Sequence, residues 1–198
     1  MKNKIIFIIN PIAGKGKGRI IETEIQHYFS QKNVDFETFL TENIGHATEI
    51  TNQVLTKNPE IIVACGGDGT INEVAQALVG SNVALGIIPI GSGNGLAANL
   101  NIPKTTEKAF ETILNAKINK IDAGKINENY FFSNMGLGID ADVINNYAQT
   151  KTRNFLGYVT ASTKAIFNFQ PKKFSIELDD QHTLDDDFYF VFCSNSNE

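Results

Sequence analysis

A glycine-rich run with a single acid at its centre carries the strongest chemical signal in the sequence. Residues Cys65 to Glu73 read Cys-Gly-Gly-Asp-Gly-Thr-Ile-Asn-Glu, directly after the apolar run Ile61 to Ala64. Closely spaced glycines let the backbone approach a ligand, and the backbone N–H groups at the start of a following helix attract phosphate. The carboxylate of Asp68 would repel phosphate unless a cation lies between them. The run therefore predicts phosphoryl transfer assisted by Mg2+, and the sequence offers no structural role for Asp68.

Two further glycine-rich loops follow predicted strands, at Asn10 to Gly18 and at Pro89 to Gly95. In an open parallel sheet the loops after the strands meet at the carboxyl edge, where ligands bind. We therefore expect the three loops to converge on one crevice. The first loop lacks the Gly-Lys-Ser/Thr of a P-loop, and the third lacks the spacing of the dinucleotide fingerprint, so a nicotinamide site is disfavoured. Lys15, Lys17 and Arg19 would neutralise phosphate oxygens or simply be solvated loop charges.

Short apolar strands alternate with amphipathic helices over the first part of the chain. The predicted strands are Lys4–Ile9, Asp35–Leu40, Glu60–Cys65 and Ala84–Ile90. The predicted helices contain Ile21–Phe29, Ala47–Leu55, Ile71–Val79 and Lys104–Asn115. This alternation predicts an α/β fold whose parallel sheet is covered by helices on both faces.

The pattern changes after about residue 120. Strands are expected at Lys120–Ile126 and Tyr130–Asn134, then helices near 140–149 and 155–168. Phe174, Ile176 and Leu178 alternate as a strand, Asp179–Asp187 resembles a polar turn, and Phe188–Cys193 is a final strand. We predict an α/β nucleotide-binding domain over 1–120 and the start of a β-rich second domain over 121–198, with too few strands to close a core.

Composition limits the classes of function. The chain has 198 residues and a net charge of −5, which argues against nucleic acid as a partner. No apolar stretch approaches the roughly 20 residues needed to span a bilayer. Cys65 and Cys193 give no disulfide framework, so a cytoplasmic location is expected.

Three motifs, taken in order and spacing, resemble the diacylglycerol kinase catalytic domain superfamily. They are Asn10-Pro11-x-x-Gly14, Gly66-Gly67-Asp68-Gly69-Thr70-x-Asn72-Glu73 and Pro89-x-Gly91-Ser92-x-Asn94. The resemblance spans about Lys4 to Gly138 and includes bacterial lipid kinases, sphingosine kinases and ceramide kinases. It implies a nucleotide domain like that of phosphofructokinases and NAD kinases, followed by a β-sandwich domain. It also implies transfer of the γ-phosphate of ATP to a lipid hydroxyl.

The resemblance assigns roles by position. The nucleotide-contacting set is Asn10, Pro11, Gly14, Thr41, Gly66, Gly67, Asp68, Gly69, Thr70, Asn72, Glu73, Gly91, Ser92 and Asn94. Thr41 opens the segment Thr41–Ala47, which matches the family's Thr-x-x-x-Gly-His-Ala, and His46 is then a helix-start residue and not a metal ligand. Asp68 is the catalytic candidate, and Asp68 and Asp122 would hold Mg2+ through water.

The sequence departs from the family pattern in two places, which bear on the choice of lipid substrate and on the general base. The third loop reads Gly91-Ser92-Gly93-Asn94-Gly95, whereas many bacterial members have Gly-Thr-x-Asn-Asp. The Gly-Ser-Gly-Asn form resembles the sphingosine and ceramide kinase branch. The family's C-terminal Asp-Gly segment, with its proposed general base, has no counterpart, so the chain resembles a truncated member. Asp140 matches a family segment near the lipid site, or is a helix N-cap.

A lipid partner has one independent indication. Between Asp142 and Glu177 there is no acid, while basic and aromatic side chains are interleaved. They are Lys151, Arg153, Phe155, Tyr158, Lys164, Phe167, Phe169, Lys172, Lys173 and Phe174. Such a surface suits peripheral contact with the anionic inner face of a membrane, although a core helix with solvated lysines gives the same pattern. A homodimer, a small-molecule kinase of NAD kinase or phosphofructokinase type, and a nucleotide-binding fragment without catalysis stay open.

Overall fold

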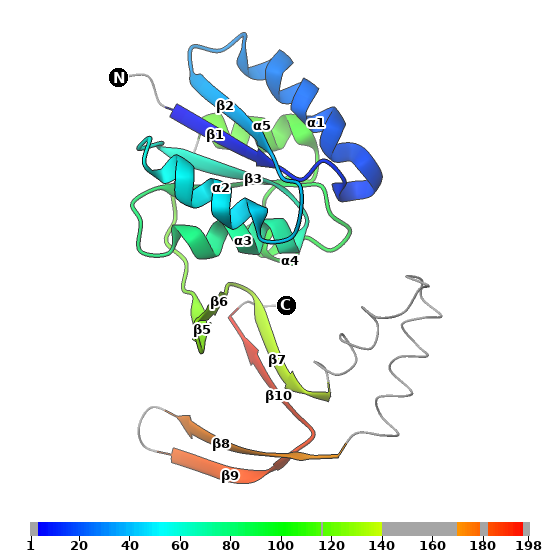
Figure 1. Ribbon diagram of the computed structural model, residues 1–198, viewed down its shortest axis with the longest axis vertical. Helices are drawn as coiled ribbons and strands as arrows, with labels where there is room; N and C mark the ends of the chain where they lie inside the picture. Colours follow the sequence, from blue (N-terminus) through cyan, green and yellow to red (C-terminus); the bar gives the residue numbers. More distant parts are fainter. Residues whose placement is uncertain (1–3, 116, 140–169, 179–181, 196–198) are drawn as a thin grey trace. The chain divides into compact units, whose positions relative to one another are not determined.

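The computed structural model describes residues 4–115, 117–139, 170–178 and 182–195 (Figure 1). The chain divides into two compact units, residues 1–133 with 195–198, and residues 134–194. The domain boundary expected near residue 120 stays a prediction. The helices expected near 140–149 and 155–168, Asp140, and the basic and aromatic residues from Lys151 to Phe169 lie outside the described residues.

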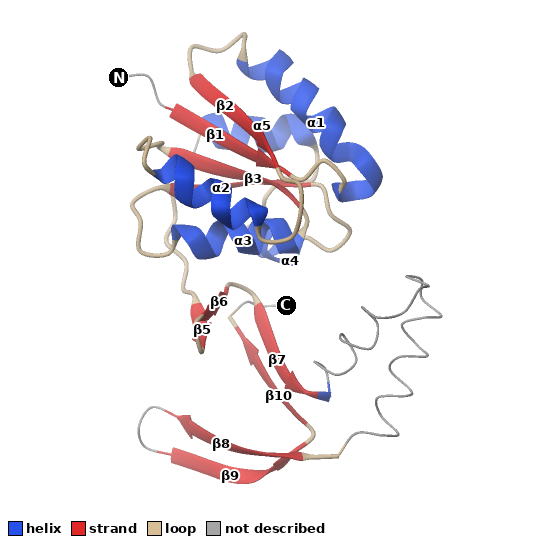
Figure 2. Cartoon of the chain, viewed as in Figure 1, coloured by secondary structure: helices blue, strands red, loops and turns tan. Residues whose placement is uncertain are grey.

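The first unit is built on a four-stranded parallel sheet with the order β2-β1-β3-β4, of which Figure 2 labels β2, β1 and β3. The strands are β1 (Lys4–Ile9), β2 (Asp35–Leu40), β3 (Ile61–Gly66) and β4 (Ala84–Pro89). Residues Ile5–Ile9 and Ile61–Gly66 are buried throughout, because helices cover both faces of the central strands. The α/β fold with a parallel sheet is therefore confirmed.

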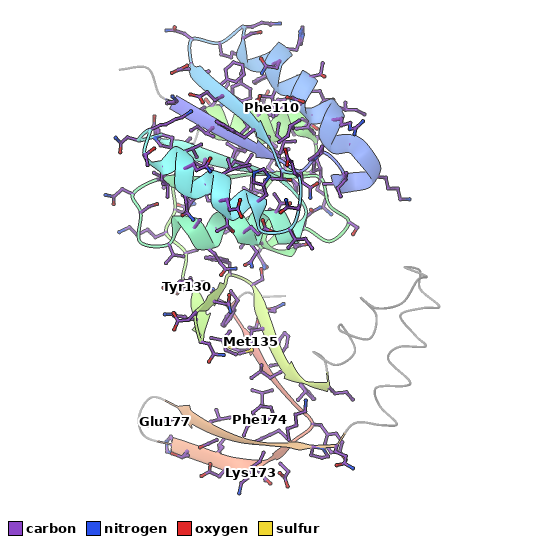
Figure 3. All side chains as sticks on the ribbon, in the orientation of Figure 1. Phe110, Tyr130, Met135, Lys173, Phe174 and Glu177 are labelled. Carbon is purple, nitrogen blue, oxygen red and sulfur yellow. The ribbon has the colours of Figure 1, made fainter. Side chains whose placement is uncertain are left out.

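Alternate side chains of β1 enter two separate cores. Ile5, Phe7 and Ile9 pack with α1 (Ala13–Phe29) and α5 (Thr106–Leu114), whose Phe110 is labelled in Figure 3. Ile6 and Ile8 pack with the helices on the other face. Those helices are α2 (His46–Leu55), α3 (Asp68–Leu78) and α4 (Gly95–Asn99). The sequence did not predict α4, because a five-residue helix shows no helical periodicity.

The first turn assigned to α1 is not regular helix. Gly14, Lys15 and Gly16 have φ angles of 59°, 60° and 90°, so the regular helix begins after them. A side chain at Gly14 would place its Cβ 2.2 Å from the backbone oxygen of Ile90. The loop that the sequence placed at Asn10–Gly18 is therefore left-handed backbone in its middle, pressed against the end of β4.

The remaining strands pair in antiparallel ladders. In the first unit β5 (Gly124–Ile126) pairs with β6 (Asn129–Phe131). In the second unit β7 (Asn134–Gly138) pairs with β10 (Phe190–Ser194), and β8 (Lys172–Leu178) with β9 (His182–Phe188). Among the described residues, we find no helix with the length and apolar character that crossing a membrane requires.

Three strand predictions need correction. The strand expected from Lys120 begins only at Gly124, and β7 was missed. Most of the expected polar turn at Asp179–Asp187 is strand β9, in which Asp185, Asp186 and Asp187 are exposed. Pairing with β8, where Lys173 lies opposite Asp187, overrides the low strand propensity of these acids.

Candidate functional site

The three glycine-rich loops meet at the carboxyl ends of β1, β3 and β4. Asn10 Nδ2 donates a hydrogen bond of 3.2 Å to Thr70 Oγ1, which joins the first loop to the second. A Cβ built on Gly91 would lie 2.5 Å from the Cα of Gly67, so the second and third loops touch backbone to backbone. The structure thus brings together the loops that the sequence expected to converge.

Asn10 is held at several points. Its backbone N–H donates to the carbonyl of Cys65 at 2.9 Å, and its Oδ1 accepts the N–H of Ile12 at 3.1 Å. The side chain therefore shapes its own turn with one end and reaches α3 with the other. This fixes the first loop beside the start of α3.

Asp68, the first residue of α3, holds the third loop. Its Oδ2 accepts the backbone N–H of Asn94 at 2.8 Å, and its Oδ1 accepts that of Gly95 at 2.7 Å. The expectation that Asp68 has no structural role is therefore wrong. The partners lie 26 and 27 residues further along the chain, beyond any local sequence signal. The residue stays exposed to solvent despite these contacts.

Glu73, further along α3, is bonded to the segment Thr41–Ala47. Its Oε1 accepts the N–H of Gly45 at 3.0 Å, and its Oε2 accepts that of Ala47 at 3.1 Å. Thr48 Oγ1 donates to the Glu73 carbonyl at 3.2 Å. The start of α2, with His46 as its first residue, is in this way attached to α3.

Asn94 folds back on its own loop. With φ at 61°, its Oδ1 accepts the N–H of Gly91 at 2.9 Å, and its Nδ2 donates to the Gly91 carbonyl at 2.7 Å. Both ends of the amide thus maintain the turn, while Ser92 is exposed. A direct contact of either side chain with a nucleotide stays a prediction.

A cleft of about 270 Å³ lies beside these loops in the first unit. Its lining is Asn10, Pro11, Ile12, Thr41, Glu42, Asn43, Ile44, Ala47, Gly69, Thr70 and Glu73. Six of these belong to the set expected to contact nucleotide: Asn10, Pro11, Thr41, Gly69, Thr70 and Glu73. The other expected contacts do not line it: Gly14, Gly66, Gly67, Asp68, Asn72, Gly91, Ser92 and Asn94.

The lining of the cleft combines negative charge with exposed apolar side chains. Among the described residues, it includes the carboxylates of Glu42 and Glu73 and no lysine or arginine. Two large apolar side chains at the cleft are open to solvent, with Ile12 76% and Ile44 96% exposed. Sequence reasoning missed both, and their only signal was their place inside the motif segments. Exposed isoleucines at the cleft offer a contact surface for a flat apolar group.

Asp122, the second expected magnesium residue, lies in the segment before β5 and is exposed. Its carbonyl accepts a hydrogen bond of 2.7 Å from Asn195 Nδ2. In the described part of the chain, no group of three or more His, Cys, Asp and Glu side chains is arranged to hold a metal ion. A contact of Asp68 and Asp122 with Mg2+ through water stays a prediction.

Cys65, at the start of the glycine-rich run, is fully buried at the end of β3. Burial raises the pKa of the Cys65 thiol well above its usual range. The thiol is therefore neutral at physiological pH and is no candidate nucleophile.

Comparisons with known proteins identify the family. The family model for the diacylglycerol kinase catalytic domain matches residues 4–126. A probable lipid kinase YegS-like of Klebsiella pneumoniae (strain 342) is 34% identical over 151 residues, covering 75% of this chain and 51% of the relative. A diacylglycerol kinase of Bacillus subtilis (strain 168) is 30% identical over 178 residues, covering 87% of this chain and 58% of the relative.

A solved structure shows the same fold. The putative diacylglycerol kinase from Bacillus anthracis str. Sterne superposes with a TM-score of 0.75 at 24% identity, covering 99% of this chain and 65% of that one. The chain thus spans between about half and two thirds of the length of these proteins. Because the family model covers more than half of the chain, the protein belongs to the family of the diacylglycerol kinase catalytic domain.

Proposed function

We propose that this chain carries the nucleotide site of a lipid kinase that transfers the γ-phosphate of ATP to a lipid hydroxyl group. One observation carries the proposal: the three glycine-rich loops and the segment Thr41–Ala47 are fastened together, and the first two loops and that segment line one cleft. The fastening contacts are Asn10 to Thr70, Asp68 to Gly95, and Glu73 to Ala47. Family membership supports the kinase class.

The charge of the cleft suggests which part of ATP it takes. Of the residues that the structure describes, two carboxylates and no cation line it, so phosphate groups would be repelled there. Ribose hydroxyls can donate to carboxylate oxygens such as those of Glu42, and a base can lie against Ile12 and Ile44. We therefore place the nucleoside in the cleft. The phosphates would lie outside it, towards the start of α3 and the exposed Lys15 and Lys17.

Magnesium fits this arrangement as a companion of ATP. Asp68 is exposed, and each of its oxygens accepts one backbone N–H, which leaves lone pairs for water. Mg2+ commonly keeps several waters and takes one or two carboxylates plus substrate phosphates, so Asp68, with Asp122, would hold it through water. When bound, it would neutralise charge on the transferring phosphoryl group.

Phosphoryl transfer depends chiefly on positioning and on neutralising charge. In this chain Asp68 fixes the second loop against the third, and Asn10 fixes the first loop against α3. We keep Asp68 as the proposed catalytic residue, because its exposed carboxylate lies at the helix start where the phosphates would end. The lipid hydroxyl also needs a proton acceptor, and Asp68 is the candidate in the described residues.

The test has two stages. Binding of a fluorescent ATP analogue to this chain measures the nucleotide site, with Asp68→Asn as the comparison. Transfer of labelled phosphate from ATP is then measured with diacylglycerol, sphingosine and ceramide in mixed micelles, and with NAD and a sugar phosphate. Transfer to a lipid alone supports the proposal, whereas transfer to NAD or sugar phosphate, or no ATP binding, overturns it.

One observation favours a second reading. The chain spans only about half to two thirds of its relatives' length. ATP binding without transfer to any acceptor would identify it as a nucleotide-binding fragment.

Cytoplasmic location, peripheral membrane contact and a homodimer also belong to the proposal. Co-sedimentation with anionic vesicles and analytical ultracentrifugation test the last two.

A further inference from the structure

Both carboxylate oxygens of Glu73 are engaged by the backbone of another segment. Each oxygen accepts a different backbone N–H of the neighbouring segment, that of Gly45 at 3.0 Å and that of Ala47 at 3.1 Å. Glu73 lies on α3, whereas both donors lie at the start of α2. The carboxylate is therefore an anchor between two helices, in addition to lining the cleft.

The start of α2 has no cap of its own. Its N-cap is Gly45, which has a φ of 87° and no side chain to accept the orphan amides of the first turn. A carboxylate is favoured at a helix N-terminus, where the backbone amides and the helix dipole are positive. Glu73 thus supplies from α3 the cap that the α2 sequence lacks.

The other end of the segment is held separately. Thr41 is buried, and its N–H donates to the carbonyl of Ile9 on β1 at 2.9 Å. Between the two anchors, Glu42 N–H donates to His46 Nδ1 at 3.0 Å, and Ile44 is open to solvent. The sheet thus fixes one end of this cleft wall, and Glu73 fixes the other.

We propose that Glu73 is a positioning residue, which holds the segment Thr41–Ala47 against α3 and so sets the shape of the nucleoside cleft. This inference rests on the proposed function, and it differs from a direct contact between Glu73 and phosphate. The Glu73 carboxylate already accepts two backbone N–H groups of this segment, and its negative charge would repel a phosphate group. Its effect on ATP therefore runs through the position of Ile44 and its neighbours.

Two substitutions separate the anchor from the charge. Glu73→Ala removes both acceptors, whereas Glu73→Gln keeps the length but turns an NH2 group towards one of the amides. Glu24→Gln is the matched control, because Glu24 is an exposed acid on α1, which packs on the other face of the sheet. We expect backbone amide hydrogen exchange at Gly45 and Ala47 to accelerate in Glu73→Ala, less in Glu73→Gln, and not at all in the control.

Nucleotide binding tests the consequence for the cleft. The affinities are measured at a temperature well below the unfolding midpoint of every variant. Glu73→Ala should lower the affinities for adenosine and for ATP by a similar factor, about tenfold. If Glu73 instead held a metal ion at the phosphates, Glu73→Ala would weaken the binding of ATP and leave that of adenosine unchanged, which overturns the proposal. A merely stabilising role would lower the unfolding midpoint and leave both affinities unchanged, which overturns it as well.

Failure of the proposed function looks different. If the wild-type chain binds neither ATP nor adenosine, the nucleotide site is wrong whatever Glu73 does. The exchange experiment still decides the anchor in that case, because it needs no ligand. Unchanged exchange at Gly45 and Ala47 in Glu73→Ala overturns the positioning role directly.

Discussion

The backbone N–H of Gly95 donates to the carboxylate of Asp68, with 2.7 Å between the nitrogen and Oδ1. The other carboxylate oxygen accepts the N–H of Asn94 at 2.8 Å. One acid at the start of α3 thus satisfies two amides at the start of α4, which would otherwise be left to water. The glycine-rich loops after β3 and β4 are joined through this single side chain.

Asp68→Asn should therefore affect both stability and catalysis. Asparagine offers one acceptor oxygen, and its NH2 group faces the second amide, so about 1 kcal/mol of unfolding free energy should be lost. Turnover should be abolished while the fold persists, because the proposed water-mediated contact with Mg2+ needs the carboxylate. Urea unfolding and labelled-ATP transfer measure the two effects, with Glu24→Gln as control. Full activity in Asp68→Asn would remove Asp68 from the active site.

Gly66→Ala should destabilise the folded chain, whereas Gly69→Ala should not. A Cβ on Gly66 would lie 2.5 Å from Thr70 Cβ and 2.6 Å from Thr70 Oγ1, at the buried junction of β3 and α3. Relieving that clash must displace Thr70, which also accepts from Asn10, so we expect a cost of about 1–3 kcal/mol.

Gly69 is the matched control within the same run. A Cβ there meets nothing within 4 Å, and the residue is in the first turn of α3. Alanine should be neutral or stabilising by up to about 1 kcal/mol, through its better helix propensity. Thermal unfolding of the two variants side by side measures the difference. Equal midpoints would show that the β3–α3 junction is looser than described.

Glu37 should give the stability a recognisable pH dependence. It lies 2.6 Å from Lys4 Nζ and 2.5 Å from Lys57 Nζ. The hydrogen bond from Lys4, followed by that from Lys57, holds the pKa of Glu37 below its usual value. The hydrogen bond with Glu37 raises the pKa of Lys4.

The signs of the two shifts define the window. The lowered pKa of Glu37 gives stability that is present above the unfolded value near 4.3 and lost as pH falls through the folded value. The raised pKa of Lys4 gives stability that is present below about 10.4 and lost as pH rises through the folded value. Glu37→Gln should therefore lower the unfolding midpoint most between about pH 5 and 10. The difference should shrink in high salt, since the pairs are partly exposed. A difference that persists unchanged at pH 2 would contradict the assignment.

The sheet could be predicted because its central strands β1 and β3 are buried on both faces and each strand is a short apolar or β-prone run between helical patterns. The predicted bounds Lys4–Ile9 and Asp35–Leu40 are those of β1 and β2. Strand β9 could not be predicted in the same way, because Asp185, Asp186 and Asp187 have low strand propensity and their pairing with β8 is a tertiary contact.

The site shows the same limit. Parallel topology required the three loops to meet. The bond between Asn10 and Thr70 and the close approach of Gly91 to Gly67 show that they do. The partners of Asp68 and Glu73 lie 26 to 28 residues away in sequence, and no local pattern identifies them. The sequence therefore identified these two acids as important and misjudged what Asp68 does to the fold.

Ile44→Ala should weaken nucleotide binding and leave the fold intact. Ile44 is 96% exposed, so its removal takes almost no buried apolar surface from the folded chain, and the unfolding free energy should change by less than about 0.5 kcal/mol. If the base of the nucleotide lies against Ile44, the lost contact should lower the affinity for ATP by about three- to tenfold. Ile20→Ala is the control, because Ile20 is 58% exposed on α1 and does not line the cleft. Titration with a fluorescent ATP analogue measures the affinities. Equal affinities for the two variants would place the base elsewhere and leave the exposure of Ile44 unrelated to the nucleotide.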